Sequence, residues 1–411
     1  MGSVQRDKAT RTSANPSRPL TDQASTSAKV GVSRIMPVSI AHVLRTYGVH
    51  GGERQLARLF AAEDPARYEN TFFSVYKNPP CTEYFSRIPN LRQRIVLGLS
   101  VPVFPKLRNE MLLLLVLPVL QLRMLYLLAT GNFRICVAHG IQGAAACWLA
   151  AWLLPYVRFV YVHRGTKSDA GSHPVFKLLY RPFEVIAGVS VATAGSLKPL
   201  VRDGRTLTLE NGIDWQAFIA AAAVCEKRHS PGVVTLISSA RLLPHKAQAF
   251  LLEAFAILVR ERPDVELVVA GDGPERENLM AQADALGISG KVRFLGHVSD
   301  INCRIVNSDI FVHASEVEGM SNAVLEAMTL GLPSVVVDAP GVTECHIEAD
   351  TGFVVQRRPS DMAARLVTLI DDAELRQRMG SQARKRVQEQ YSIAANVARY
   401  HALYAKLLAG S

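Results

Sequence analysis

Two carboxylates, Glu318 and Glu326, flank a segment that reads Glu-Gly-Met-Ser-Asn-Ala-Val-Leu-Glu. An apolar strand pattern precedes this segment, and a helix is expected to begin near Ser321. A helix N-terminus presents free backbone N–H groups and the positive end of its dipole to an anion. The pattern therefore predicts a phosphate-binding loop, with Glu326 accepting hydrogen bonds from ribose hydroxyls and Glu318 in reach of a donor sugar. Two solvated surface carboxylates are the alternative.

Two cations, Arg241 and Lys246, follow the apolar strand pattern VVTLISSA and are separated by a short turn. Arginine offers a planar fork and lysine a point charge, so together they could hold a diphosphate and offset the charge on a leaving nucleotide without Mg²⁺. A basic segment before a helix, with no ligand, is the alternative.

Glycines and histidines mark further strand ends. Gly51 and Gly52 join the strand SIAHVL to a helix and would let backbone amides approach a phosphate or a sugar closely. His163 ends the strand RFVYV and His139 ends FRICVA, so either imidazole could face a ligand. A tight turn without a ligand and two structural histidines are the alternatives.

One glycine motif points to another class of protein. Gly271-Asp-Gly-Pro-Glu-Arg276 resembles the start of a dinucleotide fingerprint, but Arg276 occupies the position of the third glycine. This departure disfavours an NAD(P)- or FAD-dependent oxidoreductase.

Short β-rich runs alternate with helical runs from Val38 onward, and the alternation restarts after Asn211. This is the βαβ pattern of parallel sheets covered by helices. Asn211-Gly212 is a turn signal between the two blocks. We therefore expect an α/β fold of two Rossmann-like, doubly wound domains that face a deep cleft, with the ligand between them. The expected division is a disordered tail at 1–35, a first Rossmann-like domain at 36–210, a second at 211–385 and a C-terminal helix at 386–411.

Composition limits the class of protein. The chain has 411 residues, 49% of them hydrophobic, and a net charge of +10, which fits two globular domains and anionic partners. Basic residues do not cluster with stacking aromatics, which argues against nucleic acid. The scattered cysteines contain no C-x-x-C pair, so we expect reduced thiols and a cytoplasmic protein. The first residues lack a secretory apolar run, and Met36 is a candidate start.

Two apolar stretches, Met111 to Leu122 and Ile141 to Val157, fall short of the ~20 uninterrupted apolar residues that span a membrane. Pro118 is expected to break the first, and both are expected to be buried helices. The alternative is a peripheral patch on the inner face of the cytoplasmic membrane, because basic residues that could meet anionic headgroups surround the first stretch. These are Arg92, Arg94, Lys106, Arg108 and Arg123.

Taken together, the motifs resemble glycosyltransferase family 4, a group of GT-B enzymes that retain anomeric configuration. The resemblance covers roughly residues 38 to 408 and rests on the order of Gly51-Gly52, VYVHRGT, Asn211-Gly-Ile-Asp, Arg241 with Lys246, AGDGP, VRFLG, and Glu318 with Glu326. Ala240, Arg164 and Ala247 depart from its usual pattern, which puts the loop geometry and the substrate in doubt.

The resemblance implies that the chain transfers a sugar from a nucleotide-diphosphate sugar, most readily a UDP- or GDP-sugar, without a cofactor or a metal ion. It also implies that the domain at 36–210 binds the acceptor, that the domain at 211–385 binds the nucleotide sugar, and that the C-terminal helix at 386–411 packs back on the first domain. A lipid-linked or saccharide acceptor in lipopolysaccharide or exopolysaccharide synthesis is the expected context. His163, Glu318, Arg241 and Lys246 are the expected catalytic residues. The expected donor-binding residues are Gly51, Gly52, Arg241, Lys246, Phe294, Gly296, Glu318, Gly319, Met320, Ser321, Asn322 and Glu326. A GT-B sugar-nucleotide epimerase and a non-catalytic sugar-nucleotide-binding module are the competing functions.

Overall fold

The computed structural model describes residues 36–46, 48–100, 106–165, 174–202, 204–226 and 232–410, with the side chains of 99–100, 106–114 and 174 left out. The expected tail at 1–35 lies outside the described residues. So do the side chains of Lys106 and Arg108.

The first half of the described chain forms a seven-stranded parallel sheet in the order β3-β2-β1-β4-β5-β6-β7. Its strands are β1 (Val38–Leu44), β2 (Tyr68–Lys77), β3 (Arg92–Ser100), β4 (Ile135–His139), β5 (Arg158–His163), β6 (Val185–Gly188) and β7 (Thr206–Thr208). Its helices are α1 (Gly51–Ala62), α2 (Pro79–Ser86), α3 (Lys106–Thr130), α4 (Gly140–Leu153), α5 (Pro174–Tyr180) and α6 (Val191–Leu197).

The second half forms a six-stranded parallel sheet in the order β10-β9-β8-β11-β12-β13. Its strands are β8 (Val234–Ser239), β9 (Val265–Ala270), β10 (Val292–Gly296), β11 (Ile310–His313), β12 (Ser334–Val337) and β13 (Gly352–Val355). Its helices are α7 (Trp215–Ala223), α8 (Gln248–Glu261), α9 (Arg276–Ala285), α10 (Ile301–Val306), α11 (Asn322–Thr329), α12 (Pro359–Asp371) and α13 (Ala373–Gln390), and α14 (Ile393–Ala409) ends the chain.

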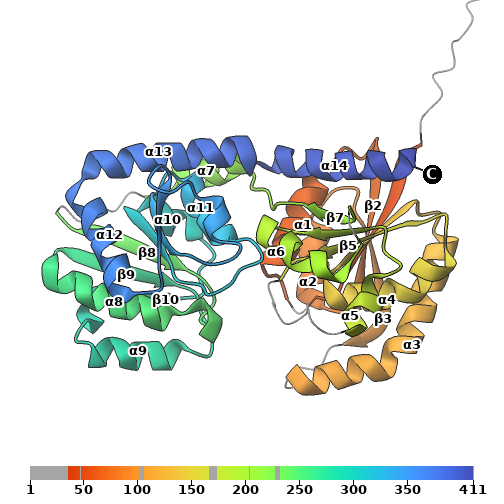
Figure 1. Ribbon diagram of the computed structural model, residues 1–411, viewed down its shortest axis with the longest axis horizontal. Helices are drawn as coiled ribbons and strands as arrows, with labels where there is room; N and C mark the ends of the chain where they lie inside the picture. Colours follow the sequence, from red (N-terminus) through yellow and green to blue (C-terminus); the bar gives the residue numbers. More distant parts are fainter. Residues whose placement is uncertain are drawn as a thin grey trace, which may run out of the picture. The chain divides into compact units, whose positions relative to one another are not determined.

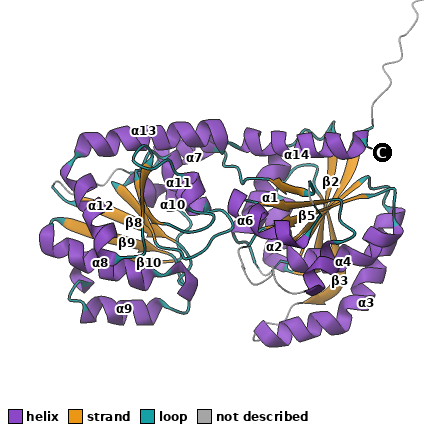
Figure 2. Ribbon diagram, in the orientation of Figure 1, coloured by secondary structure: helices purple, strands orange, loops and turns teal. Residues whose placement is uncertain are grey.

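Both faces of each sheet are apolar and covered by helices (Figure 1, Figure 2). In β1, Ile40 packs with α1 residues on one face, while the next residue, Ala41, packs with α3 and α4 residues on the other. In β8, Ile237 packs in the hydrophobic cluster on one face of the second sheet, and its neighbour Leu236 packs in the cluster on the other face. Side chains that alternate between two dry faces explain why these strands are apolar runs. The expected fold class, two Rossmann-like sheets of the GT-B type, is confirmed.

The chain passes between the two sheets twice, and the two passages are hydrogen-bonded to each other. The amide of Ile213 donates to the Tyr391 carbonyl (2.8 Å), and the amide of Ile393 donates to the Ile213 carbonyl (2.9 Å). Gly212 is needed here, because a Cβ would lie 2.9 Å from the Ser392 carbonyl oxygen. The division at residues 210 and 211 falls in this region and stays a prediction.

The last helix, α14, lies against α1, as the blue ribbon of Figure 1 shows. The Tyr404 ring packs edge-on to Tyr68 of β2 with centroids 5.3 Å apart, and its hydroxyl lies 3.5 Å from His42 Nε2. These contacts attach the last helix to the first sheet.

The expectation for the first apolar stretch is wrong in two respects. Helix α3 continues through Pro118, and only one of its faces is buried, with Leu120 and Met124 inside. Leu115 is 77% exposed, and Val119 and Leu122 are also exposed. The buried residues Leu120, Met124 and Leu128 are spaced four apart and form one stripe, and an amphipathic helix needs only one covered stripe. No helix within the described residues is long and apolar enough to cross a membrane.

The expectation of reduced thiols is also corrected. Cys225 and Cys303 form a disulfide with Cα atoms 5.3 Å apart, although 78 residues separate them in sequence. The bond joins the end of α7 to α10, two helices that pack together. Spacing along the chain could not reveal it, because only the fold brings the two helices into contact.

Candidate active site

Each sheet reverses its strand order once, between β1 and β4 in the first and between β8 and β11 in the second. At such a point the loops that follow the two central strands diverge and leave a crevice at the carboxyl edge. The loop after β1 carries His50, the loop after β8 carries Arg241 and Lys246, and the loop after β11 carries Glu318. The topology therefore gathers most of the predicted site residues.

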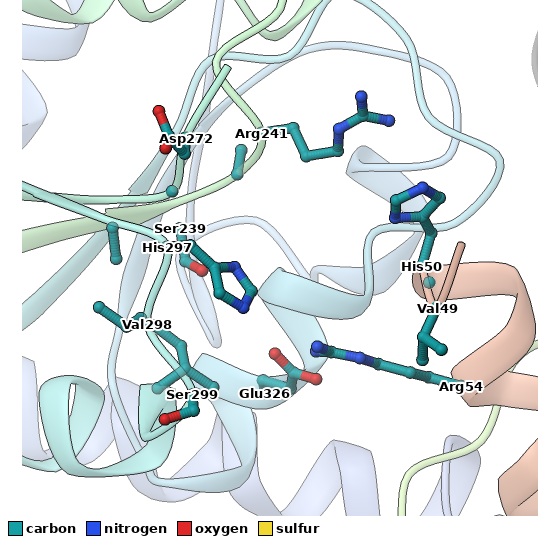
Figure 3. Close-up of a pocket in the computed structure, with 15 residues that line it drawn as sticks. Val49, His50, Arg54, Ser239, Arg241, Asp272, His297, Val298, Ser299 and Glu326 are labelled. Carbon is teal, nitrogen blue, oxygen red and sulfur yellow. The ribbon is translucent and has the colours of Figure 1, made fainter. Parts of the chain in front are cut away.

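Two adjoining cavities open at these loops. Cavity A has a volume of about 480 Å³ and is lined from α1, β8, β9 and the segment after β10, as Figure 3 shows. Cavity B has a volume of about 380 Å³ and is lined mainly by the loops after β8 and β11, with contributions from the loop after β5. The cavities share Gly51, Ser239, Ala240 and Arg241. A ligand with two polar ends could therefore extend from one into the other.

The centre of cavity B is an ion pair between Lys246 and Glu318. The Lys246 ammonium donates to Glu318 Oε1, which also accepts from the Ser315 hydroxyl at 2.8 Å and lies 3.1 Å from His313 Nε2. The Glu318 side chain is only 14% exposed. Burial raises the pKa of Glu318, but the hydrogen bonds and charges of His313 and Lys246 outweigh it and lower this pKa to about 2. The carboxylate is therefore ionised and fixed in place.

Three guanidinium groups line the cavities without a carboxylate partner. Arg241 lines both, Arg54 extends from α1 toward Glu326 in Figure 3, and Arg164 lines cavity B. Within the described part of the chain, no ion pair involves any of the three. The positive charge of Arg241 and Arg54 adds to burial in lowering the pKa of His50. Such an excess of positive charge in a concave site attracts an anion.

Glu326 lies in cavity A and is held by the first half of the molecule. Arg58 of α1 donates to Glu326 Oε1 at 3.2 Å, and the Glu326 side chain is 12% exposed. This bond holds one carboxylate oxygen of a residue that lines cavity A, toward which Arg54 also extends (Figure 3). The surface-carboxylate alternative is thereby excluded for both Glu318 and Glu326, since each is paired and largely buried.

The N-terminus of α11 lines cavity B, with Ser321 as the residue before the helix. Gly319 belongs to a crowded turn, because a Cβ there would lie 2.3 Å from the Arg164 carbonyl oxygen. Asn322 fixes the turn to the first sheet, since its Oδ1 accepts from Gln55 (2.9 Å) and Asn211 (3.1 Å). The first-turn N–H groups of the helix thus face cavity B from a rigid frame.

The glycines of α1 lie where close approach is needed. Gly51 and Gly52 form the first two residues of the helix, and both line cavity B. A Cβ on Gly51 would lie 3.1 Å from the Asn322 side chain. The sequence pattern placed these glycines in a loop, whereas they open the helix itself.

Three of the residues expected to act in catalysis or donor binding do not line cavity A or cavity B, and neither does the strand-end candidate His139, which is buried. His163 is buried, with its Nδ1 2.6 Å from the Tyr161 hydroxyl, and burial lowers its pKa to about 4. Phe294 packs on the core of the second sheet. Gly296 accepts a bond from the Gly271 amide at 2.8 Å, next to the His297 segment that does line cavity A. A role for these three in binding stays a prediction.

Sequence reasoning missed several lining residues. They are His50, Arg54, Arg164, Asn211, His245, Asp272, His297 and His313. Arg164 was noted only as a departure, yet its guanidinium lies in cavity B and donates from Nε to His139 Nδ1 at 3.2 Å. A signal was available for Arg54, because it follows the helix-opening glycines by one turn and must share their side of α1.

Ala247, one of the residues that depart from the usual family pattern, adopts an unusual backbone conformation. This residue has φ 52° and ψ 39°, the left-handed conformation that a glycine adopts without strain. Ala247 ends the turn that carries Lys246 into cavity B. The turn geometry is therefore kept, with an alanine in an unfavourable conformation.

Comparisons with known proteins agree with this geometry. Residues 226–386 match the family described as glycosyl transferases group 1. The chain is 27% identical over 283 residues, 66% of its length, to the N-acetyl-alpha-D-glucosaminyl L-malate synthase of Bacillus anthracis, of which the match covers 74%. It is 32% identical over 171 residues, 41% of its length, to the lipopolysaccharide core biosynthesis glycosyltransferase LpsE of Rhizobium meliloti. The match spans about half of that relative, 49%.

A solved structure shows the same fold. The crystal structure of Anabaena Alr3699/HepE in complex with UDP and glucose superimposes with a TM-score of 0.71 at 18% identity, covering 89% of this chain and 99% of that one. The two-sheet fold is the GT-B fold, residues 226–386 match the glycosyl transferases group 1 family, and this chain is similar to glycosyltransferases such as LpsE.

Proposed function

We propose that the chain is a retaining glycosyltransferase of family 4 that transfers a sugar from a nucleotide-diphosphate sugar to a lipid-linked or saccharide acceptor. The observation that carries the proposal is the charge arrangement of cavities A and B. Arg54, Arg164 and Arg241 lack carboxylate partners within the described residues, whereas Glu318 and Glu326 are fixed in hydrogen bonds. The unpaired arginines suit a diphosphate, and the fixed carboxylates suit the hydroxyl groups of a sugar.

The two cavities suggest how the donor would lie. Its diphosphate would contact Arg241, which lines both cavities, and Lys246, which lines cavity B. Its ribose would lie in cavity A against Glu326, and the transferred sugar would lie in cavity B against Glu318. The nucleobase would then border His297 and the residues after β10.

In the proposed reaction, the positive charges of the site stabilise the diphosphate as it leaves the sugar. The bond between the sugar carbon and the diphosphate oxygen breaks, the acceptor hydroxyl attacks the same face, and the departing phosphate oxygen takes the hydroxyl proton. Lys246, Arg241 and the first-turn N–H groups of α11 stabilise the charge that develops on the diphosphate. No metal ion is needed in this scheme, because side chains and backbone amides supply the positive charge. The paired crossings at Ile213 would serve as the hinge for closure of the cleft.

The biological context is proposed from the relatives and the first sheet. LpsE of Rhizobium meliloti acts in lipopolysaccharide core biosynthesis, and we propose a cell-envelope acceptor here. Exposed apolar residues on α3, such as Leu115 and Leu122, lie on the same helix as Arg123. An apolar face with basic neighbours suits peripheral contact with an anionic membrane.

Product analysis tests the reaction. The protein is incubated with UDP- and GDP-sugars in turn, with and without a saccharide or lipid-linked acceptor, and the anomeric configuration of the product is read by proton NMR. We expect transfer with retention, and unchanged rates after treatment with a chelator. Release of a free sugar nucleotide isomer without an acceptor would support the epimerase instead. Donor binding without transfer or donor hydrolysis would support a non-catalytic module.

A further inference from the structure

A third cavity of about 300 Å³ lies at the other edge of the first sheet. Arg181 precedes β6 and Arg205 precedes β7, so this cavity C is at the amino ends of these strands. Cavity B, in contrast, is lined by Arg164 and Val189, which follow the carboxyl ends of β5 and β6. Cavity C is therefore separated from the cleft by the length of the strands.

Cavity C is strongly basic. Four of its lining residues are cationic, and the rest are Tyr180, Pro199, Leu200 and Val201. The four cations are Lys177, Arg181, Arg202 and Arg205. Among the described residues no carboxylate lines the cavity, and none forms an ion pair with Lys177, Arg181 or Arg202. Asp203, in the same loop, lies outside the described residues.

Arg205 is held in place rather than free on the surface. Its Nε donates to the Glu184 carbonyl at 3.2 Å, and its Nη2 donates to the Arg181 carbonyl at 3.4 Å. Burial and the nearby charge of Arg202 lower the pKa of Arg205, and Glu184 partly opposes this. Like charges held together in a concave site repel one another until an anion binds between them.

Apolar surface lies beside the cavity on α4 and α5. The Arg181 guanidinium lies 5.6 Å from the centre of the Trp152 ring, which is itself 46% exposed. Leu178 follows Lys177 on α5 and is also exposed, as are Leu153 and Tyr156 at the end of α4. Exposed tryptophan, tyrosine and leucine next to arginine are typical of a surface at the level of lipid headgroups.

We propose that cavity C is a second, non-catalytic anion site, and that it binds the phosphate group of an anionic phospholipid. Lys177, Arg181 and Arg202 neutralise the phosphate around the fixed Arg205. Trp152 and Leu178 contact the apolar part of the lipid. The proposal does not depend on which sugar the cleft transfers, nor on the membrane contact proposed for α3, because it rests on residues of α4, α5 and the segment before β7.

Charge-neutral variants separate this site from the cleft. The double variant Lys177→Gln/Arg202→Gln removes two exposed cations and leaves Arg205 with its carbonyl partners. Arg378→Gln/Lys385→Gln removes the same charge from α13 and serves as the matched control. Thermal stabilisation by UDP and GDP is measured for each variant, and we expect no change, which would show that the cleft is intact.

Binding is measured with two probes. The first is co-sedimentation with phosphatidylcholine vesicles that contain phosphatidic acid, against phosphatidylcholine vesicles alone. The second is calorimetric titration with inorganic pyrophosphate in a Lys246→Ala background, which weakens binding in the cleft. We expect the Lys177/Arg202 variant to lose about 30-fold in vesicle affinity, as the loss of two cations near an anionic membrane would cost, and the control to stay near wild type.

Each outcome decides the proposal. Loss of vesicle binding specific to the Lys177/Arg202 variant supports a lipid phosphate as the ligand. Loss of pyrophosphate binding with unchanged vesicle binding overturns the lipid assignment in favour of a soluble phosphorylated ligand. Equal behaviour of the two double variants with both probes overturns the site altogether.

Discussion

Two buried glutamates, one in each half of the molecule, have opposite electrostatic environments. Glu318 in cavity B has Lys246, His313 and Ser315 around one carboxylate oxygen, and its pKa falls to about 2. Glu63, at the end of α1 beneath α14, is 1% exposed, and burial raises its pKa to about 7 although Asn70 donates a hydrogen bond to it. His401 Nε2 lies 3.8 Å from Glu63, too far for a hydrogen bond.

The comparison of Glu318 with Glu63 shows that cavity B stabilises a buried negative charge, whereas the region around Glu63 does not. Desolvation acts on both carboxyl groups and disfavours their ionised forms. Only in cavity B do cations and hydrogen-bond donors outweigh that penalty. Lys246 is already paired with Glu318, so the positive charge for a second anion comes from the unpaired Arg241, which lines the same cavity.

The largest expected effect is on transfer and comes from the cation of cavity B. Lys246→Met keeps the length of the side chain and removes its charge, so the diphosphate loses one stabilising contact in the transition state. We expect the rate of transfer to fall about 10²–10³-fold, as for loss of one preorganised donor. Initial rates with saturating donor measure this, and circular dichroism checks that the fold is kept. A variant with a normal rate would remove Lys246 from the proposed mechanism.

The next effect is on stability at low pH. The pKa of Glu318 is lowered on folding, so its contribution is complete above its unfolded pKa of about 4.5 and is lost as the pH falls toward 2. Glu318→Gln should therefore be less stable than wild type by roughly 2–3 kcal/mol at neutral pH and equal to it near pH 2. Urea denaturation at several pH values measures the difference. A constant difference across this range would contradict the assignment.

Glu63 should show the reverse dependence. Its pKa is raised on folding, so wild-type stability is complete below about pH 4.5 and is lost as the pH rises through about 7. Glu63→Gln should be more stable than wild type by roughly 1–3 kcal/mol near pH 8, with the gain vanishing near pH 4. The same urea titrations compare the two variants directly. A destabilised Glu63→Gln protein at pH 8 would show that the carboxylate is stabilised there rather than merely buried.

The smallest effect is expected at the turn beside Lys246. Ala247→Gly relieves the left-handed backbone, but it also frees the unfolded chain and removes a buried methyl group. These contributions nearly cancel, so the free energy of unfolding should change by less than about 1 kcal/mol. Thermal denaturation of the two proteins measures this change. The rate of transfer should stay at the wild-type level. A loss of more than about 2 kcal/mol would mean that the methyl group packs in a way that only alanine allows.

The second sheet and its loops were predictable from the sequence because their signals are local. Arg241 and Lys246 follow an apolar strand, and Glu318 and Ser321 lie between a strand and a helix, so periodicity alone puts them at one carboxyl edge. The pairing of Lys246 with Glu318 was not predictable, since 72 residues separate them and only the order of β8 and β11 makes them neighbours.

The contribution of the first half was harder to predict for the same reason. Arg58 reaches Glu326 across 268 residues, and Gln55 reaches Asn322 across 267. Neither residue belongs to a motif, and each looks like an ordinary polar residue on an amphipathic helix. The disulfide between Cys225 and Cys303 and the exposed face of α3 depend on tertiary contacts in the same way.

Calorimetric titration of UDP and GDP into wild type and Arg241→Ala tests the central claim most directly. The account predicts that at least one nucleotide binds the wild-type protein at one site, and that loss of the unpaired guanidinium weakens this binding by about tenfold or more. The control Arg378→Ala, on α13, should bind as wild type does. Absence of binding to the wild type, or equal affinity of Arg241→Ala, would contradict a nucleotide-diphosphate site in the cleft.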